Sequence, residues 1–266
     1  MPLGRFLGKV CILSGATDGI GLATARRLGL EGCKVVVSSR TYENVQNALD
    51  VLRDEGIEAS GIPCHHGKKE DRKKLIDYTL ERYGKFDHVF MNAGVNPHVG
   101  SVLTVTEEQF EKVFDINVKA NFQFIQECVP HLAERGGGSV VTNSTGAACD
   151  PGICTIGQDV RLYLISKLTL SALTSHVSRE CWRKNVRINT VMPGIIDTKF
   201  LRGGVSEDSV FKHLTMLDLP YNEVTARLGT PEEIASVVAF LLSDDASYVN
   251  GECLSCTGGL SVGSYS

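Results

Sequence analysis

The sequence has little of what marks membrane-spanning, secreted or nucleic-acid-binding proteins. No apolar run approaches the roughly 20 residues that cross a bilayer. Lysine and arginine number 27 against 31 acidic residues, a net charge of −4 that gives no basic surface for nucleic acid. The N-terminal stretch lacks a small-residue cleavage site, so we expect no signal peptide. These absences are typical of an ordinary globular protein.

The cysteines lack a pairing pattern. The nine are scattered and odd in number, and several lie inside apolar segments, so we interpret them as small buried hydrophobic residues in a reducing compartment. Cys253-x-x-Cys256 resembles a redox pair, and His65-His66 beside Cys64 resembles part of a metal site. Neither has a second half at ligand spacing, so we expect no metal.

Short apolar runs alternate with longer stretches of helical period. The predicted buried strands are Val10–Leu13, Lys34–Ser38, Phe86–Met91, Ser139–Thr142 and Val186–Met192, with a weaker one at Glu58–Pro63 and a last one near Glu252–Ser255. The predicted helices are Ile20–Leu30, Glu43–Glu55, Lys69–Tyr83, Glu107–Ala133, Leu162–Arg183 and Pro231–Leu242. This β-α rhythm predicts an α/β, doubly wound parallel sheet of Rossmann type, a single domain over 1–266 with helices on both faces.

A glycine-rich turn follows the first predicted strand and opens the first helix. Gly15, Gly19 and Gly21 let the backbone turn tightly and approach a pyrophosphate at the positive helix N-terminus. Thr17, Asp18 and Ile20 complete the turn. The motif alone is weak, but its place between strand and helix predicts a dinucleotide site.

The end of the second strand indicates which dinucleotide binds. An acid there would hold the ribose hydroxyl of NAD and repel the extra phosphate of NADP. The strand instead ends with Ser39 and Arg40, a hydroxyl donor and a permanently charged fork suited to phosphate. We therefore predict NADP as the cofactor.

Tyr163 and Lys167 lie four residues apart, on one face of a predicted helix. Alone, the pair is a weak signal. Its position after the fifth strand, at the edge where such sheets bind ligands, gives it meaning.

Taken in order, these motifs resemble the short-chain dehydrogenase/reductase family. The ordered set is Gly15/Gly19/Gly21, Asn92-Ala93-Gly94, Asn117, Ser144-Thr145, Tyr163-x-x-x-Lys167 and Pro193-Gly194. Within that family the chain is most similar to the NADPH-dependent carbonyl and retinal reductase branch, on stretches such as Val36–Arg40, Cys64–Lys68 and Arg135–Val141. The resemblance covers essentially the whole chain.

The resemblance implies roles for individual residues. Tyr163 would exchange a proton with the substrate oxygen, helped by Lys167, which would also bind the nicotinamide ribose. Asn117 would hold a water that relays protons, or would simply satisfy helix backbone. The other cofactor contacts implied are Asn92, Ala93 and Gly94, the main chain of His66, and Pro193, Gly194, Ile196 and Thr198. His65 stands where the family usually has an adenine-binding aspartate.

The sequence departs from the family pattern beside the catalytic pair. Thr145 stands where the family places a substrate-orienting serine and is the favoured residue, while the adjacent Ser144 is the alternative after a shift of one residue. About five surplus residues lie within 146–161. They form either a surface bulge or a wall of the substrate pocket. Leu201–Glu223, a long irregular stretch, is of a kind that is often functional or mobile.

The leading hypothesis is an NADP(H)-dependent oxidoreductase that interconverts a carbonyl, such as a ketone, aldehyde or retinoid-like compound, and its alcohol. Apolar residues expected at the pocket are Val95, Ile153, Ile195, Phe200, Phe211 and Leu214. The alternative is a catalytically impaired dinucleotide-binding regulatory protein. A sugar-nucleotide epimerase is disfavoured because the chain ends soon after the last strand. The resemblance also implies a homotetramer, and the absence of a peroxisomal tripeptide at the end favours the cytoplasm.

Overall fold

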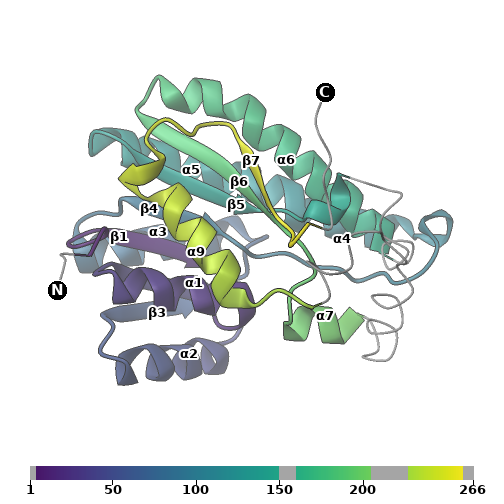
Figure 1. Ribbon diagram of the computed structural model, residues 1–266, viewed down its shortest axis with the longest axis horizontal. Coiled ribbons are helices and arrows are strands. Elements are labelled where there is room, and N and C mark those ends of the chain that lie inside the picture. The colour runs from purple at the N-terminus through teal and green to yellow at the C-terminus, as the bar shows by residue number, and fades with distance from the viewer. Residues whose placement is uncertain (1–3, 150–159, 205–226, 260–266) are drawn as a thin grey trace.

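A computed structural model describes residues 4–149, 160–204 and 227–259, and its centre is a parallel sheet (Figure 1). Seven strands pair in the order β3-β2-β1-β4-β5-β6-β7, and every pairing is parallel. The strands are β1 Val10–Ser14, β2 Lys34–Ser39, β3 Ala59–Pro63, β4 His88–Met91, β5 Gly138–Asn143, β6 Val186–Pro193 and β7 Cys253–Cys256. The predicted doubly wound fold is confirmed.

Helices cover both faces of this sheet (Figure 1). They are α1 Gly19–Leu30, α2 Tyr42–Asp54, α3 Lys69–Tyr83, α4 Glu107–Phe114, α5 Ala120–Glu134, α6 Arg161–Trp182, α7 Lys199–Gly204 and α9 Pro231–Leu242. One core packs α1, α2 and α9 against side chains such as Leu13 and Val37, and the other packs α3, α5 and α6 against Ile12 and Val36. Neighbouring strand residues thus point into opposite cores, which explains the continuous apolar runs.

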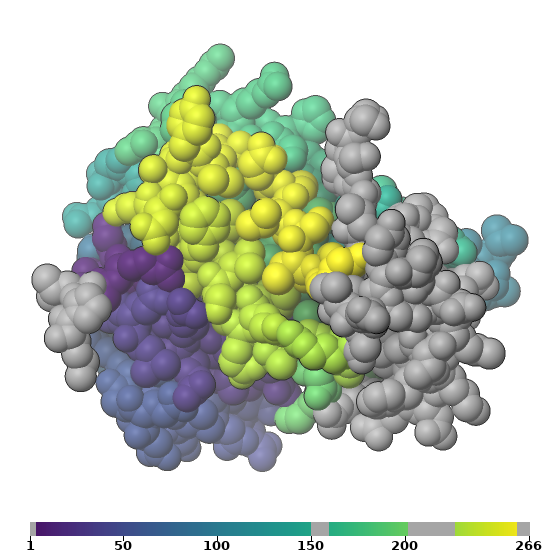
Figure 2. Space-filling model, in the orientation of Figure 1, coloured from purple at the N-terminus to yellow at the C-terminus, as the bar shows by residue number. Residues whose placement is uncertain are grey.

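Helix starts agree with the capping signals in the sequence. Thr106 and Thr230 each accept a hydrogen bond from the backbone N–H three residues on, and the side chains of Gln109 and Glu233 accept one from the threonine backbone N–H, so both form capping boxes. Figure 2 shows α9, which begins at Pro231, lying beside the N-terminal part of the chain. Capping therefore fixes where these two helices begin.

The helix predicted over 107–133 is interrupted in its middle. A π-helical turn, Asp115–Lys119, separates α4 from α5. Such turns insert one extra residue into a helix and are frequent at functional sites. Here the turn carries Asn117, whose side chain is completely buried. The hydrophobic periodicity of the sequence does not reveal this inserted residue, because the helix continues on both sides of it.

A buried ion pair joins α3 to α5. The Arg72 guanidinium, fully buried, donates to both carboxylate oxygens of Glu127 at 2.9 Å and to the Gln123 side chain at 2.9 Å. It also donates to the main-chain carbonyl of His66 at 2.9 Å. A buried charge that water does not reach requires hydrogen bonds of this kind. The bond to the His66 carbonyl also fixes the position of the segment after β3.

The other expectations can be compared directly. Of the eight described cysteines none forms a disulfide, and five are buried; Cys154 lies outside the described residues. No group of three or more possible metal ligands occurs in the described ranges. Within those same ranges, no helix is both long and apolar enough to cross a membrane. The strand predicted from Phe86 begins at His88, and the remaining outer bounds agree or shift by one residue.

Candidate active site

The glycine-rich turn lies between β1 and α1, as the sequence predicts. Gly15 and Gly19 adopt φ values of 60° and 50°, which glycine reaches without strain. A Cβ on Gly21 would clash with the carbonyl oxygen of Gly15, so the helix can approach the turn only because this residue is glycine. Asp18 caps α1 by accepting from the Gly19 N–H at 2.8 Å. The turn is shaped for close backbone approach to a ligand.

Polar groups without protein partners follow β2 and β3. The Ser39 hydroxyl oxygen is buried and has no hydrogen-bond partner among the described residues, and Arg40 beside it is exposed. Nδ1 of His65 is likewise buried and unpartnered there. Unsatisfied buried polar atoms are costly unless a ligand or water meets them. This end of the sheet therefore has donors available for a phosphate-bearing group.

His66 is placed differently from its neighbours. Its ring packs edge-on against Phe124 with centroids 5.3 Å apart, and burial lowers its pKa to about 3. The ring is therefore neutral at physiological pH. Its carbonyl accepts from Arg72, so this main-chain oxygen is already engaged within the protein.

Tyr163 and Lys167 lie one turn apart on α6. Lys167 is 2% exposed, and its ammonium donates to the Asn143 carbonyl at 2.6 Å and lies 5.6 Å from the centre of the Tyr163 ring. Burial lowers the pKa of Lys167 to about 8 and raises the pKa of the Tyr163 phenol. Burial thus opposes the tyrosinate, whereas the adjacent ammonium favours it. The Tyr163 proton can therefore move at near-neutral pH only if the effect of the ammonium outweighs that of burial.

Asn117 connects three segments around the pair. Its side-chain amide donates to the Val95 carbonyl at 2.9 Å and to the Ser166 hydroxyl at 3.0 Å, and its oxygen accepts from the Val95 N–H at 2.8 Å. A Cβ on Gly94 would lie 3.2 Å from the Lys167 ammonium nitrogen and 3.4 Å from the Asn117 side-chain oxygen. The glycine therefore keeps room beside both polar groups.

The two candidate hydroxyls after β5 differ in their partners. Ser144 is 3% exposed, and its Oγ donates to the Lys167 carbonyl at 2.8 Å and lies 2.8 Å from the Ser171 hydroxyl. These two short, buried contacts already occupy the Ser144 hydroxyl, so it would have to break them to reach a substrate. Thr145 is only partly buried, and its Oγ1 donates to the Pro193 carbonyl at a longer 3.3 Å. This geometry favours Thr145 as the hydroxyl that meets a substrate.

The segment after β6 lies next to these groups. The Gly194 N–H bonds to the Cys256 carbonyl at 3.0 Å, and Ile196 forms an isolated bridge with Gly229. Thr198 approaches the glycine-rich turn, since a Cβ on Gly19 would lie 3.1 Å from its methyl group. The Phe200 ring faces Tyr163 at 5.6 Å between centroids. Of the other expected pocket residues, Val95 and Ile195 are partly buried, while Ile153, Phe211 and Leu214 lie outside the described residues.

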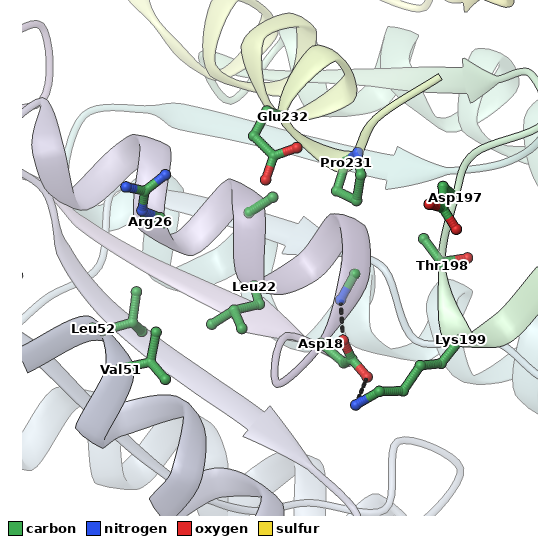
Figure 3. Close-up of a pocket in the computed structure, with 12 residues that line it drawn as sticks. Asp18, Leu22, Arg26, Val51, Leu52, Asp197, Thr198, Lys199, Pro231 and Glu232 are labelled. Carbon is green, nitrogen blue, oxygen red and sulfur yellow. Dashed lines mark hydrogen bonds and ion pairs between the residues drawn. The ribbon is translucent and has the colours of Figure 1, made fainter. Parts of the chain in front are cut away.

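A groove of about 340 Å³ runs along the outer face of α1 (Figure 3). Its lining comes from α1, α2, residues 197–199 and the start of α9, and does not include Tyr163 or Lys167. At one end Lys199 forms an ion pair with Asp18 at 2.9 Å, with both side chains exposed. This pair ties the glycine-rich turn to the segment after β6, although exposed pairs stabilise little.

Sequence reasoning missed residues that join these parts. Asn143 bonds to Asn92 at 2.7 Å through its side chain and accepts from Lys167 through its carbonyl. The available signal was an asparagine closing an otherwise apolar run in β5. Ser166, between the catalytic candidates, accepts from Asn117 and donates to the Tyr163 carbonyl at 2.6 Å. Its role depends on contacts that linear spacing does not show.

Comparisons with known proteins give consistent results. A family model described as enoyl-(acyl carrier protein) reductase matches residues 15–261. Dehydrogenase/reductase SDR family member 4 of Oryctolagus cuniculus is 41% identical over 255 residues, covering 94% of this chain and 93% of the relative. Tropinone reductase-like 3 of Erythroxylum coca is 39% identical, covering 96% and 94%.

Solved structures agree with the sequence comparisons. Levodione reductase superposes with a TM-score of 0.87 at 28% identity, covering 96% of this chain and 98% of that one. A 7α-hydroxysteroid dehydrogenase, solved with NADH and 7-oxo glycochenodeoxycholic acid, superposes with a TM-score of 0.87 at 27% identity, covering 98% and 97%.

The two hydroxyls after β5 are distinguished by parallel substitutions. Thr145→Ala should lower kcat for carbonyl reduction by about 10²-fold, because it removes a donor to the developing alkoxide, while Thr145→Ser should retain most activity. Ser144→Ala should keep kcat within a few-fold and lower thermal stability, because it removes a buried bond to α6. Steady-state kinetics and thermal unfolding measure both. A larger kcat loss in Ser144→Ala than in Thr145→Ala would reverse the assignment.

Proposed function

The chain belongs to the short-chain dehydrogenase/reductase family of oxidoreductases, which use a nicotinamide dinucleotide, and from this premise we propose that it is an NADP(H)-dependent carbonyl reductase. The observation that carries the proposal is the pair on α6: Tyr163 stands one turn before a buried Lys167 whose ammonium is held at 2.6 Å by the end of β5. Both lie at the carboxyl edge of the sheet, where doubly wound folds bind ligands.

The chain's own groups fit a dinucleotide. The clash that a Cβ on Gly21 would cause shows a turn built for close backbone approach, and the N-terminus of α1 favours the negative pyrophosphate. The same pyrophosphate site would include Gly15, Thr17, Asp18, Gly19 and Ile20. Further contacts are proposed from the ends of β4 and β6, namely Asn92, Ala93, Gly94, Pro193, Gly194, Ile196 and Thr198, and from the segment of His66.

NADP is proposed over NAD on two observations at the end of β2. The buried Ser39 hydroxyl has no partner in the described part of the chain, and Arg40 is exposed with no carboxylate at the strand end. A phosphate on the adenosine ribose would accept from both. The 7α-hydroxysteroid dehydrogenase was solved with NADH, and that cofactor is a property of the neighbour.

The chemistry would divide between the cofactor and the protein. A bound NADPH supplies the hydride to the carbonyl carbon. Tyr163 donates its hydroxyl proton to the carbonyl oxygen, and Thr145 orients that oxygen by hydrogen bonding. Lys167 favours the resulting tyrosinate through its charge, and Asn117 keeps the segment beside it in place. The product alcohol therefore contains the hydride on carbon and the tyrosine proton on oxygen.

An apolar carbonyl compound is the proposed substrate. Phe200 packs near Tyr163, and Val95 and Ile195 contribute partly buried apolar surface at the same edge. The names of the similar proteins refer to reductases and to a dehydrogenase with a keto-steroid. Tyr163, Lys167 and Asn117 are all present, and this counts against the catalytically impaired alternative.

A homotetramer is also proposed. Ile165 and Leu168 of α6 are 47% and 40% exposed, and Leu254 on the edge strand β7 is 37% exposed. Apolar groups on an outer helix face and an open strand edge are suited to association with further copies.

The reaction is tested with purified protein and a panel of ketones, aldehydes and an enoyl thioester. We expect NADPH oxidation with at least one carbonyl compound and none with the thioester. Tyr163→Phe should lower kcat by 10²-fold or more, because the proton donor is lost, and should leave the NADPH dissociation constant within about twofold. Tyr83→Phe is the matched control on α3. A protein that oxidises NADPH with no carbonyl compound contradicts the proposed function.

The cofactor preference is tested by direct binding titration. Arg40→Asp should weaken NADP binding by about 10- to 100-fold, because a charge-assisted contact becomes repulsive, and should leave NAD binding equal or tighter. Arg135→Ala, which removes an exposed arginine after α5, should change neither. Equal loss of both dinucleotides in Arg40→Asp would show that the residue has no part in the preference.

The assembly is tested by sedimentation velocity. We expect a species of four chains, reduced to smaller species by Leu168→Glu, which places a charge on the apolar face of α6. Lys184→Glu, beyond the end of α6, serves as the charge control and should leave the tetramer intact. A wild-type protein that sediments as a monomer at micromolar concentration overturns the assignment.

A further inference from the structure

A row of side-chain hydrogen bonds continues the sheet beyond the ends of three strands. The backbone ladders that join β4 to β1 and to β5 both end at Met91. One residue later, the Asn92 side-chain nitrogen donates to the Gly15 carbonyl at 2.6 Å. The Asn143 side-chain nitrogen in turn donates to the Asn92 side-chain oxygen at 2.7 Å. This amide row, Gly15–Asn92–Asn143, crosses the point where strand order reverses.

The direction of every bond in the amide row is fixed. A carbonyl oxygen only accepts, so Asn92 must turn its nitrogen towards Gly15 and its oxygen towards Asn143. Asn143 must then donate with its own nitrogen. This leaves its side-chain oxygen buried and, among the residues that the structure describes, without a partner. A buried amide that keeps one orientation although its oxygen is unsatisfied indicates a role beyond packing.

The amide row ends at the catalytic lysine. The main-chain carbonyl of Asn143 accepts from the Lys167 ammonium at 2.6 Å, with the two residues only 8% and 2% exposed. Tyr163 lies against the ammonium, and the neutral ring of His66 is close enough for Lys167 to influence its pKa. The side chain and the carbonyl of Asn143 belong to one residue, so a shift of the first moves the second.

Building on the proposed reaction, we propose that Asn143 is a positioning residue, which holds the Lys167 ammonium in register with the glycine-rich turn through Asn92. The turn would hold the pyrophosphate of the cofactor, and Lys167 would act at its nicotinamide ribose. Their separation is set by β1, β4 and β5, and the backbone pairing of β4 with both neighbours ends at Met91. A displacement of about 1 Å at a catalytic group can cost roughly 10²-fold in rate.

Asn143→Val tests the proposal, because valine retains the main-chain carbonyl and removes only the amide. Thr142→Val is the matched control. It deletes buried bonds from the preceding residue, at 2.8 Å to Thr190 and 3.1 Å to Thr174 on α6, and leaves the amide row intact. The first readout is the pKa of Lys167, followed by NMR of protein labelled with ¹³C at lysine Cε, with the signal assigned from its absence in Lys167→Arg. The second readout is kcat with NADPH and a carbonyl substrate.

The wild-type pKa should lie at about 8, so the ammonium is present below that pH and is lost above it. In Asn143→Val the lysine loses its fixed position, so its pKa should shift by half a unit or more, upward if the ammonium gains water and downward if it loses only the carbonyl, and kcat should fall at least tenfold. Thr142→Val should lower thermal stability and change neither quantity. If Asn143→Val matches Thr142→Val in the lysine pKa or in kcat, Asn143 is merely structural and the proposal is overturned.

A second variant tests the proposal if Asn143→Val does not fold. Asn92→Ala breaks the same row at its centre, and should likewise shift the Lys167 pKa. An unchanged lysine pKa there overturns the proposal. The NMR titration needs no substrate, so it also separates the two claims. A wild-type protein without reductase activity refutes the proposed function, whereas the lysine titration still decides whether the amide row positions Lys167.

Discussion

A buried ammonium is the constraint around which the site is arranged. Removing a lysine charge from water is costly, and Lys167 is 2% exposed with a pKa lowered by that burial. Its contacts in the described chain are the Asn143 carbonyl and the face of Tyr163. The surrounding elements must therefore hold these two partners accurately, since a misplaced carbonyl would leave the charge unsatisfied. The same burial makes the lysine proton available near neutral pH.

The parallel sheet explains why chemically active residues gather on one edge. Strands covered by helices on both faces bury their side chains in two apolar cores, so most positions in the strands are apolar. The candidate site residues lie where the strands end: Ser39 is the last residue of β2, Asn92 follows β4, and Ser144 and Thr145 follow β5. The π-helical turn adds Asn117 to this edge from a helix. Segments far apart in sequence thus meet in one place.

Local signals carried much of the fold and part of the site. Apolar runs located the strands, capping boxes located the starts of α4 and α9, and the i,i+4 spacing placed Tyr163 and Lys167 on one face of α6. The choice between Ser144 and Thr145 could not be made in this way, because adjacent hydroxyls look equivalent in a sequence. Only their partners, the Lys167 carbonyl and the Pro193 carbonyl, distinguish them.

By itself, then, the sequence determined the parallel sheet, the glycine turn, the family resemblance and the tyrosine–lysine pair, since each depends on short-range periodicity or spacing. The tertiary structure alone decided the amide row from Gly15 to Asn143, the π-turn at Asn117 and the burial of Lys167. Hydrogen bonds between strand ends join residues more than fifty positions apart, and the desolvation of a charge depends on everything packed around it. Neither these long-range hydrogen bonds nor the desolvation of Lys167 is a local property, so neither can be predicted from the residues adjacent in sequence.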